Sequence, residues 1–424
     1  MEGADRARPE ALTRRRFLTS VGASGAAVAV GTGGFIAGRM SRPSEVQQVA
    51  GERESVAFYG THQAGIATPA QDRVAFAAFD VTTADAGQLK ALLGTWSAAA
   101  SRMTLGLPIG SAGAAAQAPP IDTGEALDLS PARLTITVGF GSSLFDERFG
   151  LAKKRPAALV DLPVFTGDTL DPGKSNGDLC VQACSDDPQV AFHVLRNFAR
   201  LARGVAVMRW SQLGFGRTSS TSVRQQTPRN LMGFKDGTNN VKAENSSELA
   251  DFVWVGDETD QAWMRGGSYC VTRRIRMTIE TWDNDFLGDQ EAVIGRTKSS
   301  GAPLTGKEEF DEPDLAAKNM RGELVIPADS HIRLAAPATN DGQKLLRRGY
   351  SYTDGIDQRS GLLDAGLFFI AYQKDPRRQF VPIQRRLAAG DALNEYIRHT
   401  GSGVFAIPPG LGAPGDWYGK RLFG

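Results

Sequence analysis

Cysteine is scarce in this 424-residue chain, which contains only Cys180, Cys184 and Cys270. An odd number of cysteines excludes a framework of disulfides that pairs all of them. Cys180 and Cys184 stand four residues apart in a segment with the character of a strand. At that spacing they lie on one face about 13 Å apart, which is too far for a disulfide. We therefore interpret both as small packing residues.

The chain also lacks an excess of either charge, because 48 lysines and arginines face 47 aspartates and glutamates. Residues 1–50 contain seven arginines and four acids, a net charge of +3, which leaves 41 basic and 43 acidic groups, a net charge of −2, for residues 51–424. A body this close to neutral excludes binding to nucleic acid by bulk electrostatics. We expect no nucleic-acid partner. The composition, 41% hydrophobic and 22% charged, is that of a globular protein.

Long apolar runs are missing too, since the stretch from Val21 to Gly38 is rich in glycine and alanine and too weakly hydrophobic for a membrane span. Basic residues followed by a moderately apolar stretch are the pattern of a signal peptide. Arg14 and Arg15, followed closely by Phe17, resemble the twin-arginine export signal. We predict that residues 1–50 are this signal peptide and a linker. The protein would cross the twin-arginine translocase folded and reside in the periplasm, the cell envelope or outside the cell.

Export of folded proteins commonly follows insertion of a cofactor, so we expect a cofactor. Histidine, with four residues, is too sparse for an HExxH motif or a paired-histidine zinc site. His62 falls in a glycine-rich loop, His193 inside a helix and His399 near a helix end. His331 is expected in a short extended run with Arg333 two residues on. One imidazole with a nearby arginine suits a haem iron and a propionate, although a packing histidine is the alternative.

Alternating extended and helical runs predict the fold. A single core stops growing beyond ~250–300 residues, which indicates two domains. The first set comprises strands at 74–81, 134–140, 179–184 and 206–210 and helices at 85–100 and 188–201. The second set comprises strands at 269–279, 350–352, 367–372 and 404–407 and a helix after Pro376. Strand–helix–strand–strand–helix–strand is the ferredoxin-like order.

We therefore predict an α+β fold of two tandem ferredoxin-like domains, with antiparallel sheets in a barrel-like arrangement and peripheral helices. The N-terminal domain would span residues 51–220 and the C-terminal domain residues 221–424. The join lies near residues 215–230, which are rich in Gly, Ser, Thr and Gln and poor in large apolar side chains.

The sharpest local pattern is Gly233-Phe234-Lys235-Asp236-Gly237-Thr238. Two glycines let the backbone pass close to a flat or bulky group while the carboxylate of Asp236 points at it. Calcium is a rival interpretation, although the spaced acidic ligands of an EF-hand loop are missing. A third interpretation is a plain Asp-Gly turn without a ligand. The residues alone leave these three open.

This segment resembles the Gly-x-x-Asp-Gly motif of dye-decolourising haem peroxidases. Three further segments, at residues 177–193, 295–304 and 345–352, resemble the same family in the same order. The resemblance covers roughly residue 55 to the C-terminus. With the twin-arginine leader, the chain is most similar to the exported deferrochelatase/peroxidase branch that accompanies ferrous-iron uptake systems.

The resemblance implies a b-type haem, one per chain, with His331 as the iron ligand. The second nitrogen of such a histidine usually meets a carboxylate, for which Asp391 is the candidate and Glu395 the reserve. Asp236 matches the distal carboxylate. Arg347, rather than its neighbour Arg348, matches the distal arginine.

The same resemblance extends to the rest of the cofactor site. Gly237, Thr238 and Asn239 would lie against the porphyrin together with Arg347. Arg296 and Arg333 would lie near its propionates.

The implied function is a secreted haem peroxidase that reduces hydrogen peroxide and oxidises dye-like or phenolic donors. One alternative is a deferrochelatase, which releases iron from haem and leaves protoporphyrin intact. Another is a haem-binding partner of a ferrous-iron permease with little turnover. Asp236 and Arg347 argue against that carrier, because it needs neither an acid–base group nor a fixed charge. We also expect a homo-oligomer.

Replacement of Arg14 and Arg15 by lysine tests the export signal. Lysine keeps the charge but loses the paired guanidinium groups that the export receptor reads. We expect the double variant to remain in the cytoplasm, as measured by cell fractionation. Export at the wild-type level would refute the twin-arginine interpretation.

Overall fold

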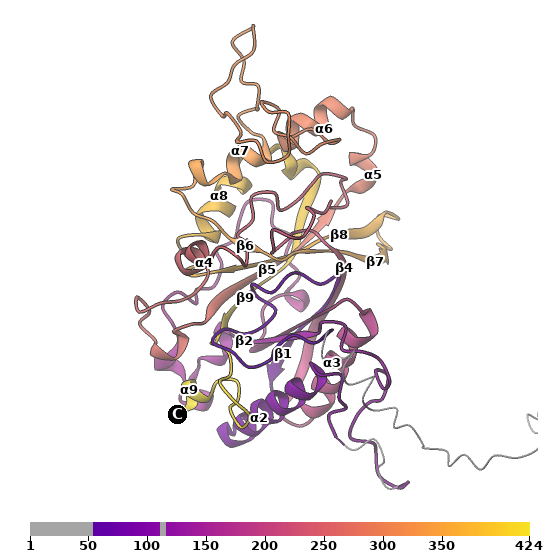
Figure 1. Cartoon of the computed structure of the whole chain (residues 1–424), viewed down its shortest axis with the longest axis vertical. Helices are drawn as coiled ribbons and strands as arrows, with labels where there is room; N and C mark the ends of the chain where they lie inside the picture. Colours follow the sequence, from indigo (N-terminus) through magenta and orange to yellow (C-terminus); the bar gives the residue numbers. More distant parts are fainter. Residues whose placement is uncertain (1–53, 111–115) are drawn as a thin grey trace, which may run out of the picture. The chain divides into compact units, whose positions relative to one another are not determined.

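The computed structural model describes residues 54–110 and 116–424 (Figure 1). The predicted twin-arginine segment lies outside the described residues, so the export signal stays a prediction. Across the described part of the chain, no helix combines the length and the apolar character that a membrane crossing requires.

The N-terminal half contains four strands and two long helices in the predicted order. The elements are β1 (Arg73–Val81), α2 (Ala86–Met103), β2 (Thr135–Gly141), β3 (Leu179–Ser185), α3 (Pro188–Leu201) and β4 (Ala206–Arg217). The strands pair antiparallel in the order β2-β3-β1-β4. Both helices begin as the sequence predicts, because Asp85 and Asp187 accept hydrogen bonds from the first backbone N–H groups and Pro188 opens α3.

The C-terminal half repeats this arrangement with longer insertions. Its elements are α4 (Ser246–Phe252), β5 (Ser268–Met277), α5 (Ile279–Trp282), α6 (Leu287–Ile294), α7 (His331–Ala335), β6 (Leu346–Arg347), β7 (Tyr350–Ile356), β8 (Leu363–Gln373), α8 (Phe380–Gly390), β9 (Ile397–Ile407) and α9 (Lys420–Phe423). The main strands run in the order β9-β5-β8-β7. The short strand β6 pairs with the end of β8.

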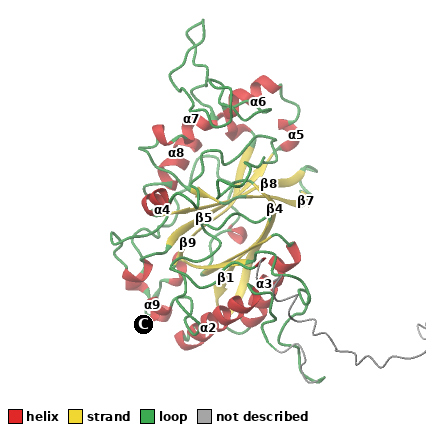
Figure 2. Cartoon of the chain, in the orientation of Figure 1, coloured by secondary structure: helices red, strands yellow, loops and turns green. Residues whose placement is uncertain are grey.

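The two halves share one closed sheet. Strand β2 pairs with β9 through Phe140 and Ala406, and β4 pairs with β7 through Phe215 and Ser351. The predicted α+β, ferredoxin-like and barrel-like architecture is thereby confirmed. The sheet runs across the predicted boundary at residue 220, and the division into domains stays a prediction. Figure 2 shows α2 and α3 on one side of the strands and α7 and α8 on the other.

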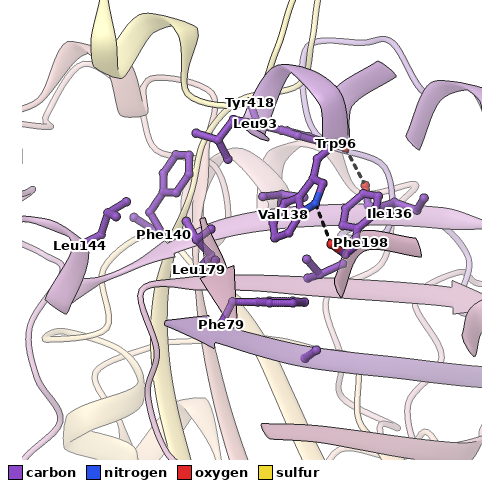
Figure 3. Packing of buried hydrophobic residues seen from close by; sticks show 14 of the residues in the cluster. Phe79, Leu93, Trp96, Ile136, Val138, Phe140, Leu144, Leu179, Phe198 and Tyr418 are labelled. Atoms are coloured by element: carbon purple, nitrogen blue, oxygen red, sulfur yellow. Dashed lines mark hydrogen bonds between the residues drawn. The ribbon is translucent and has the colours of Figure 1, made fainter. Parts of the chain in front are cut away.

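Each strand has one face toward the barrel interior and one toward the helices. The interior holds aromatic side chains and all three cysteines, which are buried and free, as the packing interpretation expects of Cys180 and Cys184. On the outer face of the N-terminal half, Trp96 of α2 stacks on Phe198 of α3 with ring centroids 4.7 Å apart (Figure 3). Its indole N–H donates to the backbone carbonyl of Phe198 at 3.1 Å. This pair fixes α2 against α3 over the sheet.

Two sequence predictions about histidines are wrong in local structure. His399 is the third residue of β9 and belongs to this strand rather than to a helix end. His331 begins the short helix α7 rather than an extended run. The carbonyl of Ser330 accepts from the N–H of Leu334 at 3.2 Å, which closes one helical turn over residues too few to show a period.

Candidate active site

A cavity of about 380 Å³ lies between the outer face of the C-terminal half of the sheet and helices α7 and α8. This volume is in the range of small-molecule and cofactor sites. Its walls are largely apolar and include Ile275, Met277, Leu367, Phe369, Phe380 and Ile383. Strands β5 and β8 contribute alternate residues to this wall, because only every second side chain reaches one face of a strand.

His331 projects from the start of α7 into this cavity. Its Nδ1 lies 2.6 Å from a carboxylate oxygen of Asp391, which directly follows α8. The other oxygen of Asp391 accepts from the backbone N–H of Leu393 at 2.9 Å, so the buried carboxylate is itself held in place. A carboxylate at Nδ1 fixes the tautomer that carries the proton there. The other nitrogen, Nε2, is therefore a lone-pair donor, with no hydrogen-bond partner among the described residues.

The electrostatics of the site couple the His331 ring to Asp391. Burial opposes protonation of the His331 ring, but the Asp391 carboxylate outweighs burial and raises the pKa of His331 above 6.5. Asp236 adds to this effect and Arg347 opposes it, so both charged groups lie close enough to act on the ring.

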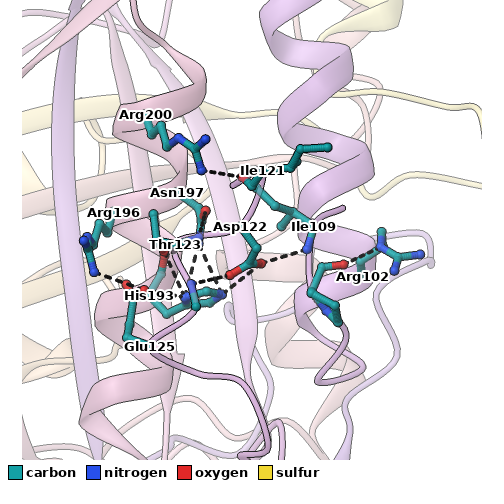
Figure 4. A network of polar contacts seen from close by, with 12 residues as sticks. Arg102, Ile109, Ile121, Asp122, Thr123, Glu125, His193, Arg196, Asn197 and Arg200 are labelled. Carbon is teal, nitrogen blue, oxygen red and sulfur yellow. Dashed lines mark hydrogen bonds and ion pairs between the residues drawn. The ribbon is translucent and has the colours of Figure 1, made fainter. Parts of the chain in front are cut away.

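The other histidines are engaged elsewhere. His62 stacks on Trp254 at 3.8 Å, and its Nδ1 lies 2.7 Å from the carbonyl of Gly266. His193 of α3 lies between Asp122 and Glu125, at 3.6 and 3.4 Å (Figure 4). Neither of these two histidines lines the cavity.

His399 does line the cavity, but both of its nitrogens have neighbours. Nδ1 lies 3.3 Å from the guanidinium of Arg273, and Nε2 lies 3.4 Å from the side-chain amide of Gln384. Burial, with a contribution from Arg273, lowers the pKa of His399 to about 3, so this ring is neutral. Of the four histidines, only His331 offers a free nitrogen to the cavity.

A second pair, Asp236 and Arg347, lines the same cavity. A guanidinium N–H of Arg347 donates to a carboxylate oxygen of Asp236 at 2.7 Å, although 111 residues separate them. Gly237 has φ +86, and a Cβ there would lie 2.9 Å from the Cα of Ser219, so the turn after Asp236 requires glycine. A carboxylate paired with arginine is a poor calcium ligand, which disfavours the calcium interpretation of this segment.

Arg348 points the other way, into the barrel. It is fully buried and donates to the carbonyl of Thr68 and the side-chain oxygen of Gln71. It does not line the cavity. The structure therefore brings Arg347, and not Arg348, to Asp236.

The other residues predicted to contact the cofactor differ in whether they line the cavity. Gly237, Thr238, Asn239 and Arg296 line the cavity. Arg333 does not, because its guanidinium donates to the carbonyls of Pro327 and Ile326 at 3.0 and 2.6 Å.

Arg333 lies away from the cavity wall for a physical reason, and its contact with a propionate stays a prediction. Residues two apart share a face in a strand but not in a helix, and His331 begins a helix. Glu395, the reserve for the histidine partner, makes no contact with His331 among the hydrogen bonds and ion pairs of the described residues.

Sequence reasoning missed Arg273. This side chain is 1% exposed, lines the cavity and forms a buried ion pair with Asp168. The available signal was the pair Arg273-Arg274 inside an otherwise apolar strand, because consecutive strand residues face opposite sides. One guanidinium therefore reaches the cavity wall and the other reaches the barrel interior.

These features fit a haem. Within the described residues, no cluster of three or more His, Cys, Asp or Glu side chains is arranged to hold a metal ion by itself. A single histidine with a free Nε2 at an apolar cavity instead has the chemistry that a haem iron requires of its protein ligand. Arg296 is buried at the cavity wall and suits an anionic edge of such a group.

Asp391→Asn tests the pairing without a cofactor. In the haem-free protein we expect the pKa of His331 to fall, because the carboxylate of Asp391, which outweighs burial, would be lost. In the wild type, the raised pKa of His331 adds to the free energy of unfolding below pH 6.5, and this contribution is lost as the pH rises through the pKa of the folded state. Asp391→Asn should therefore be less stable than the wild type mainly at acid pH. NMR titration of the ring measures the pKa, with Asp329→Asn as the exposed control. An unchanged pKa would contradict the pairing.

Comparison with known proteins places the chain in a family. The family model "Dyp-type peroxidase, N-terminal" matches residues 63–216, and "Dyp-type peroxidase, C-terminal" matches residues 227–411. Deferrochelatase of Yersinia pseudotuberculosis is 38% identical over 97% of this chain and 94% of its own.

Solved structures agree with this match. DtpA from Streptomyces lividans, in an oxyferrous/water mixed complex, has a TM-score of 0.80 and 45% identity over 88% of this chain and 98% of its own. A DyP-type peroxidase from Streptomyces coelicolor has a TM-score of 0.80 and 45% identity over 87% and 97%. The chain belongs to the Dyp-type peroxidase family.

Proposed function

We propose that the protein is an exported peroxidase that binds one haem b per chain, reduces hydrogen peroxide and oxidises dye-like or phenolic donors. The observation that carries this proposal is the meeting in one cavity of the free Nε2 of His331 with the Asp236–Arg347 pair. Family membership supports it, as does the similarity to DtpA, whose structure is of an oxyferrous complex.

When bound, the haem supplies the redox-active iron at which the oxygen–oxygen bond of peroxide is cleaved. Asp391 holds His331 so that Nε2 faces the cavity. Arg296 would meet the anionic edge of the haem, and the apolar walls limit the entry of water.

Asp236 and Arg347 suit the two demands of peroxide cleavage. A proton must move from one peroxide oxygen to the other, and negative charge must be stabilised while the bond breaks. Asp236 can take and return that proton, since only one of its oxygens is bound to Arg347. Arg347 supplies a fixed positive charge beside it, and the ion pair holds both groups in place before the reaction.

A second function follows from the relatives named deferrochelatase, which are 38–40% identical to this chain. Release of iron from haem with intact protoporphyrin would use the same cavity. Anaerobic incubation with haem, followed by assay of free protoporphyrin, separates this activity from peroxide reduction. The proposal also includes export through the twin-arginine translocase and a location outside the cytoplasm. It further includes a ferrous-iron permease as partner and a homo-oligomeric state.

Replacement of His331 by alanine tests the iron ligand. We expect the variant to lose most of its haem, because no other histidine presents a free nitrogen to the cavity. Haem content per folded chain, with circular dichroism to verify folding, measures the effect. His62→Ala is the control, and it should keep its haem. Full haem content with a histidine-ligated spectrum in His331→Ala would refute the assignment.

Asp236→Asn and Arg347→Leu test the peroxide step. Asparagine keeps the size of the side chain but cannot carry the proton, and leucine removes the positive charge. Loss of one electrostatic stabiliser typically costs about 10²–10³ in rate. We expect such slowing in stopped-flow mixing with peroxide, with haem content retained. The exposed Arg359→Leu should react normally, and wild-type rates in both test variants would overturn the distal assignment.

A further inference from the structure

Arg347 sits on a strand with few anchors. Strand β6 is only two residues long and pairs with β8 alone, at Tyr372 and Ala371. The backbone N–H and C=O of Arg347 face the opposite edge of β6, where a neighbouring strand would otherwise bind them. Fixing the guanidinium of Arg347 therefore requires another partner for its backbone.

Asn240 provides that partner. Its side-chain oxygen accepts from the N–H of Arg347 at 2.8 Å, and its side-chain NH₂ donates to the carbonyl of Arg347 at 2.8 Å. The second hydrogen of this NH₂ group is directed to the carbonyl of Ser220, at 3.0 Å. A reversed amide would set donor against donor and acceptor against acceptor, so these contacts fix its orientation. The side chain is 94% buried and takes the place of the missing strand.

The same residue is tied to the other member of the pair. The backbone N–H of Asn240 donates to the carbonyl of Gly237 at 3.2 Å, in the turn that directly follows Asp236. One residue thus contacts the Asp236 turn through its backbone and the Arg347 strand through its side chain. The 2.7 Å hydrogen bond from Arg347 to Asp236 connects the strand directly to the turn.

We propose that Asn240 is a positioning residue for peroxide cleavage, which clamps the backbone of Arg347 so that its guanidinium meets Asp236 at the cavity wall. This role rests on the proposed function, in which the pair acts on peroxide. A displacement of about 1 Å in a reacting group can cost on the order of 10²-fold in rate. We expect Asn240→Ala to slow the peroxide step about 10- to 100-fold.

The first test needs no cofactor. Hydrogen exchange of single amides, measured by mass spectrometry on the haem-free protein, should show the Arg347 amide exchanging at least about 10-fold faster in Asn240→Ala. The Arg348 amide is bound to the carbonyl of Ile370 at 2.7 Å and should stay protected. Unchanged protection of Arg347, or equal loss at both amides, would overturn the clamp.

The second test separates positioning from general loosening. Asn240→Ala should slow the reaction with peroxide when Arg347 is present and have no further effect in the Arg347→Leu background, because the lost guanidinium can no longer be misplaced. Equal slowing in both backgrounds would overturn the role. Asn240→Asp is isosteric, keeps the acceptor and loses both donors. Its carboxylate would face the carbonyl oxygens of Arg347 and Ser220, so it should slow the peroxide step as the alanine variant does, and it replaces that variant in the kinetic test if alanine fails to fold.

Asn197 is the matched control. It is also fully buried, and its side-chain NH₂ donates to Thr123 at 2.9 Å and to the carbonyl of His193 at 3.2 Å, away from the cavity. Asn197→Ala should leave both measurements at wild-type values, and slowing of the peroxide step as large as that in Asn240→Ala would overturn the role. A haem-loaded wild type that does not react with peroxide overturns the proposed function and this role with it. A reactive wild type with an unaffected Asn240→Ala overturns the role of Asn240 alone.

Discussion

Period-two alternation along β5, β8 and β9 is the constraint on which the site depends. Residues 273, 275 and 277 of β5 face the cavity, whereas Cys270 and Arg274 face the barrel interior. A slip of one residue would exchange the two faces and remove the cavity wall. Closure of the sheet protects this register, because β5 is paired on both edges, to β8 and to β9.

One irregularity in this pattern has a visible effect. The pairing of β5 with β9 shifts between Arg274 and Ile275, so that β9 carries one extra residue at Thr400. The shift brings His399 and Ser402, three residues apart, to the same face as Arg273. Each of the three nitrogens of the Arg273 guanidinium thereby has one partner, respectively in His399, Ser402 and Asp168. This network occupies His399 and leaves the cavity to His331.

The two polar pairs of the cavity are held in place by different kinds of structural element. His331 is held by the start of α7 and Asp391 by the end of α8, whereas Asp236 and Arg347 are held by a glycine turn and an edge strand. In both pairs a buried or partly buried charge is matched by an opposite charge and by backbone groups. Such matching keeps the side chains fixed before any substrate arrives, which is the condition for electrostatic catalysis.

Much of this arrangement could be predicted from the sequence. Regular strands and the caps at Asp85 and Asp187 follow from local pattern and chemistry. Asp236, Arg347 and Asp391 were placed by resemblance to a family, and the structure brings them to the cavity. Elements of two or five residues, β6 and α7, carry too few positions to show a period, which is why His331 was placed in a strand and Arg333 beside the cavity.

We propose that His331, fixed by Asp391, prepares one cavity for one haem. Titration of the haem-free protein with haem, followed by the Soret band and by the iron–histidine stretching band of the ferrous protein in resonance Raman, tests it most directly. We expect a sharp end point at one haem per chain and a histidine band that shifts when ¹⁵N-histidine is incorporated. A titration without saturation, or a saturated protein without that band, would contradict it.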